Sequence, residues 1–459
     1  MQKQNQKELL GSAPVGKLLF MLAIPTVTAQ LINMLYNIVD RIFIGHMPGD
    51  GDLALTGVGV CMPIILIVSA FAALVSSGGA PRASIFLGKQ EHENAEKTLG
   101  NCFVVQILIS LILTVVLCIW ARPMLLAFGA SENTIDYAVD YMSVYALGTV
   151  FVQLTLGMNA FITAQGFTTV SMLSVVIGAV TNIGLDALFI NVFGWGVEGA
   201  ALATIISQGV SCSWILLFLC GKKTLLRLRP KYFKPSARII FPTLALGVAT
   251  FIMQASESVI AVCFNSSLLK YGGDIAVGAM TILTSVMQFA MMPMQGFAQG
   301  AQPILSYNYG AKNAQRVKKT FRLLLMICSG YAVVLWAMVM LFPQTFAAIF
   351  TAELPLQQFA GAALRIYFAG MVLFGIQIAC QMTFVSLGKA GSSVIVAVVR
   401  KFVLLLPLIY LVPLFMENKT KGVFLAEPIA DVTAVLFTAV LFFFQFRKAM
   451  KKIEEGEHV

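Results

Sequence analysis

Apolar side chains fill long runs along this chain, and the polar stretches between the runs are short and mostly basic. Each run is near or above the roughly 20 residues that an α-helix needs to cross a bilayer. Twelve runs fit, at 18–44, 54–86, 98–121, 134–165, 170–192, 197–221, 239–266, 276–306, 320–343, 358–387, 393–416 and 422–446. Because a helix satisfies its own backbone hydrogen bonds in lipid, the pattern predicts an all-α integral membrane protein with twelve transmembrane helices.

The two halves of the chain repeat one another at a constant offset of 222 residues. Identities at this offset include Pro81 and Pro303, Gly88 and Gly310, Tyr145 and Tyr367, Gly148 and Gly370, and Gly166 and Gly388. Six spans per half make the repeats parallel, with a substrate path expected between them. The predicted division is an N-terminal lobe at 1–221, a basic linker at 222–238, a C-terminal lobe at 239–446 and a tail at 447–459.

Composition and charge support this picture and exclude several classes of protein. Only 11% of residues are charged, against about 25% in soluble domains. Most Lys and Arg residues lie in the N-terminal arm, the linker, alternate connections and the tail, which predicts cytoplasmic termini and a bilayer rather than nucleic acid as partner. The cysteines form no CxxC pair, and His46, His92 and His458 are scattered, so neither a disulfide framework nor a metal site is expected.

A polar stripe runs along the first predicted helix. Its members recur at helical spacing and share one face: Thr26, Gln30, Asn33, Asn37 and Asp40. Pro25 removes one backbone hydrogen bond below the stripe and permits a bend. Asn182 and Asp186 are one turn apart in the fifth helix, at a depth similar to that of Asp40. Burial and a neighbouring like charge both oppose ionisation of a carboxyl, so Asp40 and Asp186 form a candidate proton site. In the alternative interpretation, Asp40 lies in water at the outer interface, beside Arg41.

The second half carries different polar features. Glu257 follows Gln254 on one face of the seventh helix, and the eighth has an uncharged stripe with a methionine-rich surround that suits variable apolar ligands. The candidate substrate-path residues of this stripe are Gln288, Met292, Gln295 and Gln299. Glu427 and Asp431 begin the twelfth helix, and Arg400 in the eleventh is placed to pair with Asp431. For that set a purely structural buried salt bridge is the alternative to a functional role.

Three segments resemble those of the multidrug and toxic compound extrusion (MATE) family. They are Tyr36-Asn-Ile-Val-Asp-Arg-Ile-Phe-Ile-Gly45, Gln295-Gly-Phe-Ala-Gln-Gly-Ala-Gln-Pro303 with Tyr307-Asn-Tyr-Gly310, and Leu425-Ala-Glu-Pro-Ile-Ala-Asp431. The resemblance covers nearly the whole chain and is closest to the bacterial DinF-type and MepA-type branch. It implies a V-shaped fold of two six-helix lobes, alternating access, a bacterial plasma-membrane location and a monomer.

The resemblance also implies roles for individual residues. In proton-coupled DinF-like members the proton site matches Asp40, Asn182 and Asp186 here, and the proline that bends the first helix matches Pro25. Sodium-coupled NorM-like members use acids in helices 7 and 10; Glu257 matches the first, whereas helix 10 has Gln377 and Gln381 but no acid. A carboxylate of MepA-type members in helix 4 is replaced by Asn159.

The expected function is therefore export of cationic amphipathic drugs or toxic compounds in exchange for a cation, with H⁺ expected rather than Na⁺ and no other cofactor. The main alternative is a flippase for a lipid-linked oligosaccharide or peptidoglycan precursor, which has a related fold but should present several cations to its anionic substrate. Here Arg400 is the main exception among largely acidic mid-membrane charges. A major facilitator transporter also has twelve spans in parallel halves. An enzyme would need a nucleophile, a metal cluster or a phosphate loop, and none of these motifs occurs.

Overall fold

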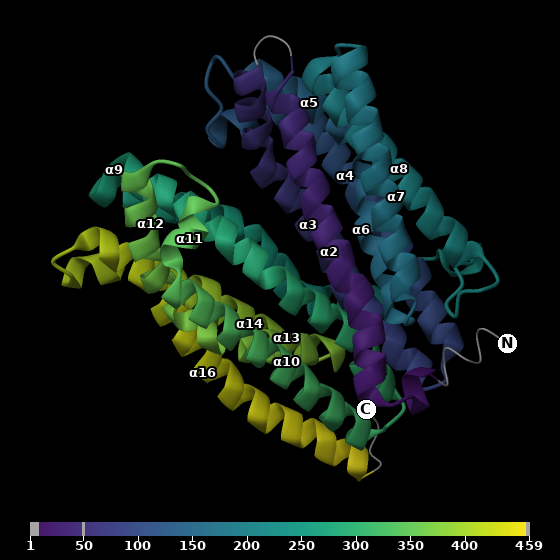
Figure 1. The fold of residues 1–459 in the computed structure, drawn as a ribbon. Coiled ribbons are helices and arrows are strands. Elements are labelled where there is room, and N and C mark those ends of the chain that lie inside the picture. Colours follow the sequence, from purple (N-terminus) through teal and green to yellow (C-terminus); the bar gives the residue numbers. More distant parts are fainter. Residues whose placement is uncertain (1–8, 48–50, 456–459) are drawn as a thin grey trace.

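The computed structural model describes residues 9–47 and 51–455, and all regular structure within them is helical. Two arms meet at the end of the molecule where the described chain begins and ends, and they diverge toward the other end as a V (Figure 1). The predicted fold class is confirmed. Lys3 and Lys7 of the basic N-terminal arm and the histidine His458 lie outside the described residues.

The N-terminal half of the chain forms one arm. Its elements are α2 (Val15–Gly45), α3 (Gly51–Gly88), α4 (His92–Ala127), α5 (Ile135–Leu147), α6 (Thr149–Ala164), α7 (Thr168–Asp186), the π-helix η1 (Ala187–Val192) and α8 (Gly196–Cys220). A linker with one 3₁₀ turn, η2 (Pro230–Tyr232), follows and leads into the second arm.

The C-terminal half forms the other arm. Its elements are α9 (Ala237–Gly310), α10 (Ala314–Leu341), α11 (Pro343–Ala348), α12 (Leu354–Tyr367), the 3₁₀ segment η3 (Phe368–Leu373), α13 (Phe374–Ser386), α14 (Ala390–Val398), the π-helix η4 (Val399–Leu405), α15 (Leu406–Leu411), the 3₁₀ segment η5 (Val412–Phe415) and α16 (Lys419–Glu454). Helix α16 continues to Glu454, so most of the predicted tail at 447–459 is the end of this helix.

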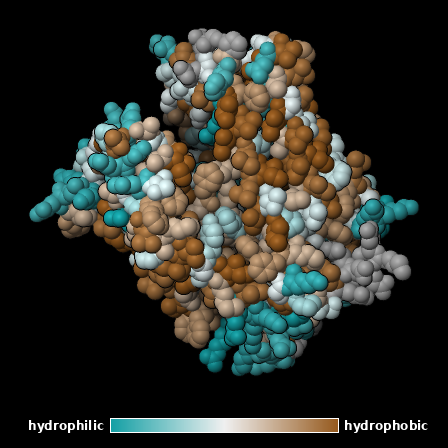
Figure 2. Space-filling view, viewed as in Figure 1, coloured by the Kyte–Doolittle hydropathy of each residue, from teal (hydrophilic) through white to brown (hydrophobic). Residues whose placement is uncertain are grey.

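The membrane spans agree with the predicted number within the described residues. Ten helices are long and apolar enough to cross a bilayer, and α5 with α6 makes an eleventh span that is bent by 59°. The 74-residue α9 holds two of the predicted spans, because the chain reverses at Gly273, where φ is 66° and ψ is −163°. Apolar side chains cover the flanks of both arms, and hydrophilic ones gather at the arm tips and at the base (Figure 2), as a bilayer around the arms requires.

Breaks in the fourth span of each half reflect the internal repeat. Gly148 separates α5 from α6, and a Cβ there would lie 2.1 Å from Ile205 Cγ2. Gly370, its partner at the 222-residue offset, lies in η3, where a Cβ would be 3.2 Å from Asp431 Cβ. The fifth span of each half contains a π-helical segment, a feature that often accompanies functional sites.

Small residues hold the two arms together at the base of the V. A Cβ on Gly88 would lie 2.0 Å from Tyr307 O, and one on Gly310 would lie 2.0 Å from Ile85 O. Ile85 and Gly88 correspond to Tyr307 and Gly310 at the repeat offset, so each arm contributes the same contact to the other. This reciprocity places a pseudo-twofold axis between α3 and the second part of α9, as expected for parallel repeats.

Candidate functional site

The predicted carboxyl pair of the N-terminal arm is buried between α2 and the end of α7. Asp40 is 7% exposed and Asp186 is 0% exposed, while Arg41 is exposed. The alternative location of Asp40, in water at the outer interface, is therefore not the one found. Asn182, which is 1% exposed, precedes Asp186 by one turn of α7.

The polar atoms of this pair have few partners. Asp40 and Asp186 are close neighbours in this site. Two carboxylates in one buried site repel each other when both are ionised, which favours a proton on one of them. Asp40 Oδ1, both oxygens of Asp186 and both amide atoms of Asn182 have no hydrogen-bond partner among the described residues. Such unpaired buried atoms are costly, and they mark a place where a proton or ligand would be stabilised.

Tyrosines surround the carboxyl pair, and the sequence analysis did not identify them. Tyr36 of α2 lies close to Asp40, Asp186 and Gln208 of α8. Tyr141 of α5, 3% exposed, lies close to Asp40 and to Thr204 of α8. Four helices thus enclose one polar cluster. The motif around Asp40 contains Tyr36, but the contributions of α5 and α8 depend on how the helices pack, which the periodicity of one helix does not reveal.

The stripe on α2 connects this cluster to the opposite arm. At its lower end Thr26, 5% exposed, donates to Gly296 O of α9 over 2.7 Å. Higher up, Asn37 Nδ2 donates to Asn33 O, at 2.6 Å, and Gln30 is half-buried. The structure therefore places Pro25, directly before Thr26, where α2 touches the other arm.

Asn159 lies inside the N-terminal arm rather than beside the carboxyl pair. Its Nδ2 donates to Ser171 O of α7, at 3.3 Å, and its buried Oδ1 has no hydrogen-bond partner among the described residues. The candidate polar residues of the other arm differ in their exposure to solvent. Gln254, Gln288 and Gln295 are exposed, and Met292 and Gln299 are half-buried.

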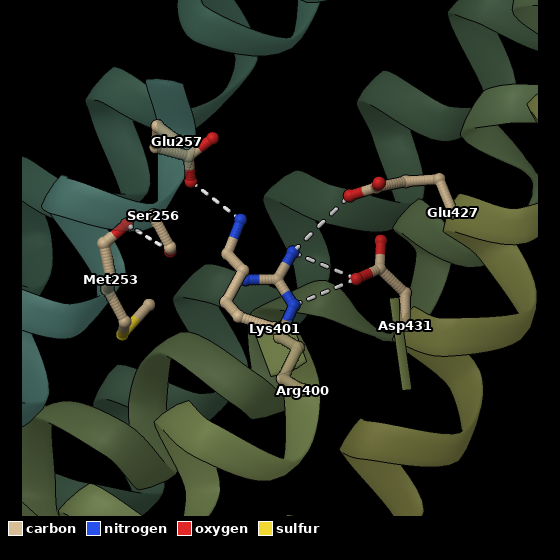
Figure 3. Close-up of polar contacts among 7 residues, drawn as sticks. All are labelled: Met253, Ser256, Glu257, Arg400, Lys401, Glu427 and Asp431. Carbon is tan, nitrogen blue, oxygen red and sulfur yellow. Dashed lines mark hydrogen bonds and ion pairs between the residues drawn. The ribbon is translucent and has the colours of Figure 1, made fainter. Parts of the chain in front are cut away.

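Five ionisable side chains meet in the C-terminal arm (Figure 3). Arg400 of η4 pairs with Asp431 through Nη2, at 2.9 Å, and through Nε, at 3.0 Å, and its Nη2 lies 3.7 Å from Glu427. The pairing of Arg400 with Asp431 suggested by the sequence is present. Arg400 also stacks over Phe374, with 4.5 Å from Cζ to the ring centroid.

Lys401 is the residue of this cluster that the sequence analysis missed. Its Nζ lies 2.6 Å from Glu257 Oε1, and its side chain is 4% exposed whereas that of Glu257 is 56% exposed. The interpretation of Arg400 as the main mid-membrane cation was therefore incomplete. The signal was present, since Arg400 and Lys401 are adjacent in one apolar run, where two unpaired cations would be prohibitively costly.

No group of three or more His, Cys, Asp and Glu residues is placed to hold a metal ion in the part of the chain that the structure describes. Helix α13 supplies no acid near Glu257. Its Gln377 is 1% exposed, and Gln381 Nε2 donates to Ser393 Oγ over 2.7 Å.

Comparisons with known proteins agree with this arrangement. The MatE family model matches residues 25–188 and again residues 249–411, once in each arm. A relative, the multidrug export protein MepA of Staphylococcus haemolyticus, is 23% identical over 413 residues, which are 90% of each chain.

Solved structures show the same fold. A crystal structure of MATE in the bent conformation has a TM-score of 0.91 at 23% identity and covers 98% of this chain and 99% of its own. An outward-facing multidrug resistance MATE family transporter of the MOP superfamily has a TM-score of 0.90 at 22% identity. The match covers 96% of this chain and 98% of that transporter. The chain is a multi-pass transporter and not an enzyme, and it belongs to the MatE family, the multidrug and toxic compound extrusion transporters.

Proposed function

We propose that this transporter exports cationic amphipathic compounds in exchange for protons, by alternating access of one path between its arms. The observation that carries the proposal is the buried pair of Asp40 and Asp186, of which Asp40 Oδ1 and both Asp186 oxygens have no hydrogen-bond partner among the described residues. A charged side chain in mid-membrane costs commonly about 3 kcal/mol. A proton or a substrate cation offsets this cost, so the two compete for one site.

The orientation follows from the basic residues. The positive-inside rule places the linker, the α9–α10 connection and both termini in the cytoplasm. The V in Figure 1 then opens to the outside, which is the state in which a proton reaches Asp40 and Asp186 and substrate leaves. We expect the transporter to work as a monomer in a bacterial plasma membrane, since each chain contains both arms.

Protonation from outside removes the negative charge between α2 and α7 and weakens the hold on a cation. Because α2 contacts the other arm at Thr26, a bend at Pro25 would pass this change to the contact between the arms. Deprotonation toward the cytoplasm restores the site. The coupling depends on different proton and substrate affinities in the two states.

The curated relatives are drug exporters along most of the chain, and they do not favour the flippase alternative. A multidrug exporter also fits a site in which Met292 and the glutamines of α9 add adaptable apolar and polar surface.

The test is ethidium export from proteoliposomes, driven by an imposed pH gradient or, separately, by a sodium gradient. We expect the pH gradient alone to drive export, and Asp40→Asn and Asp186→Asn to abolish it. The control is Asp136→Asn, which changes an exposed acid paired with Arg122. Export by both buried variants at the wild-type rate, or export driven by sodium and lost in Glu257→Gln, would overturn the assignment.

A further inference from the structure

The Lys401 ammonium occupies the position beside Glu257 that a free cation would take. Its Nζ lies 2.6 Å from Glu257 Oε1, and the two side chains come from different elements, η4 and the first part of α9. Figure 3 shows Lys401 reaching away from Arg400 toward Glu257. The carboxylate thus already has a monovalent cation, supplied by the chain itself.

The charges of the cluster explain why this matters. Glu257, Glu427 and Asp431 are three acids, and Arg400 and Lys401 are two cations, all drawn together in Figure 3. Arg400 binds Asp431 closely and Glu427 loosely, at 3.7 Å. Lys401 also acts on Glu427 through its charge. A metal ion added beside Glu257 would therefore meet an ammonium whose side chain is 4% exposed and already paired with the carboxylate.

Removing Lys401 changes the balance sharply. The cluster would then hold three acids against one cation, and Glu257 would lose the cation 2.6 Å from its Oε1. A carboxylate beside such a largely buried acidic cluster favours a counter-ion or proton in place of the lost ammonium. At mildly alkaline pH protons are scarce, so an alkali cation is the available counter-ion, and carboxylate oxygens are suitable ligands for a hard cation.

We infer that Lys401 is a tethered cation that fills the cation position of the C-terminal arm and thereby excludes Na⁺ from it. Lys401 is a specificity-determining residue in this view, and it makes the C-terminal arm independent of external sodium. The inference deepens the proposed function, on which it rests for its biological meaning. Its test measures ion binding rather than export, so each can fail without the other.

The experiment is equilibrium binding of radioactive sodium to the purified full-length protein at mildly alkaline pH, with ionic strength held constant by N-methylglucamine chloride. We expect saturable binding to Lys401→Met that is about tenfold or more tighter than any binding detected with the wild type, a change within the usual range of coupling between ligands. Methionine keeps the apolar stem of the side chain and removes only the ammonium.

Three variants make the result specific. Lys401→Arg keeps the positive charge and should bind no sodium. Lys401→Met combined with Glu257→Gln should lose the binding gained by the single variant. Lys270→Met removes an exposed lysine of α9 and should behave as the wild type.

Thermal unfolding with and without sodium gives a second readout, because a ligand that binds the folded state raises Tm. Sodium should raise the Tm of Lys401→Met and leave that of the wild type unchanged. A folded Lys401→Met that binds no more sodium than the wild type would overturn the inference, as would binding that survives Glu257→Gln.

Discussion

A carboxyl buried as deeply as Asp186 is tolerated only with a proton or a cation beside it, because the ionised form alone pays a large desolvation cost. Asp40 is an acidic neighbour of Asp186, and repulsion between two buried carboxylates favours a proton on one of them. A substrate cation that enters this site must therefore release that proton. This exchange leads to a quantitative expectation for the binding of a cationic ligand.

We predict that binding of a monovalent organic cation such as tetraphenylphosphonium weakens as pH falls, because the proton and the ligand compete. If one proton is released per cation, Kd should rise by up to about tenfold per pH unit in the acidic range. Asp186→Asn should bind more weakly and lose this pH dependence. Isothermal titration calorimetry in buffers of different ionisation enthalpy measures the proton release, and a wild type that binds equally well at every pH would contradict the competition.

Arg400 supports the C-terminal arm by neutralising acids that have no access to water. Asp431 is 1% exposed and Glu427 is 5% exposed, so Arg400→Met leaves two buried carboxylates short of a counter-ion. We expect a loss of about 3–5 kcal/mol in the free energy of unfolding, and partial recovery when Asp431→Leu is added. The control Arg122→Met breaks an exposed pair and should cost at most about 1 kcal/mol. Thermal unfolding in detergent compares the variants; equal losses for both arginines would contradict the buried role.

At the scale of single elements, α2 is both part of the site and part of the contact between the arms. Asp40 lies near the C-terminal end of α2 and Pro25 about four turns before it, on one uninterrupted helix. Two glycines allow α9 to approach α2 at Pro25. A Cβ on Gly296 would lie 2.5 Å from Val27 Cγ2, and one on Gly300 would lie 2.5 Å from Ala23 Cα. Movement of α2 therefore changes the fit between the arms directly.

We predict that Pro25→Ala slows export strongly while leaving binding of the cation nearly unchanged. Alanine restores the backbone donor to Met21 O and stiffens α2 at the point where it must bend. Export from proteoliposomes and ligand binding in detergent separate the two effects. Pro63→Ala, a proline inside α3, is the matched control. Full export by Pro25→Ala would show that no bend at this residue is needed.

The sequence predicted individual helices well and the contacts between helices poorly. Helical spacing identified the stripe that ends at Asp40, and a one-turn separation identified Asn182 with Asp186. Tyr141 and Gln208 were missed, because their place in the cluster depends on the rotation of α5 and α8. Lys401 was missed because its role rests on Glu257, which is far away in the sequence.

The sequence also did not predict the breaks within the transmembrane helices. Gly148 and Gly370 were recognised as a repeated pair, yet a glycine inside an apolar run is compatible with an unbroken helix. The bend at Gly148 arises where Ile205 of α8 fills the space that a Cβ on this residue would occupy. The contact between Gly148 and α8 determines the bend, and the pattern of residues along the chain does not reveal that contact.

At the scale of the whole molecule, the repeat produces the hinge of the V. The contact of Gly78 with Thr243 O, where a Cβ would be 1.9 Å away, links α3 to the first part of α9. Its counterpart at the repeat offset is Gly300, which packs on Ala23 of α2. The two arms therefore touch through equivalent small-residue contacts on both sides of the axis, which lets one arm rock against the other without a change of partner helices.

A set of hydrogen bonds from α10 to the segment before α2 is the natural latch of this state. Arg316 of α10 donates through Nη1 to Ala13 O, at 2.8 Å, and through Nη2 to Leu10 O, at 3.0 Å. Its Nε donates to Asn308 Oδ1, at 3.0 Å, and Asn308 Nδ2 donates to Leu10 O, also at 3.0 Å. The chain segment before α2 is thereby tied to the opposite arm, which keeps the base closed while the tips stay apart.

We predict that Arg316→Gln shifts the population toward a base-open state in which the arm tips approach each other. Losing charge-assisted hydrogen bonds of about 1.5–3 kcal/mol each would change a two-state population by tenfold or more. Spin labels at Glu132→Cys and Glu417→Cys, on exposed positions of the two arm tips, report this distance by double electron–electron resonance once the exposed Cys118 and Cys220 are replaced by serine. Arg322→Gln, on the same helix, is the control and should keep the wild-type distribution. A distribution unchanged by Arg316→Gln would mean that the glycine contacts alone hold the base closed.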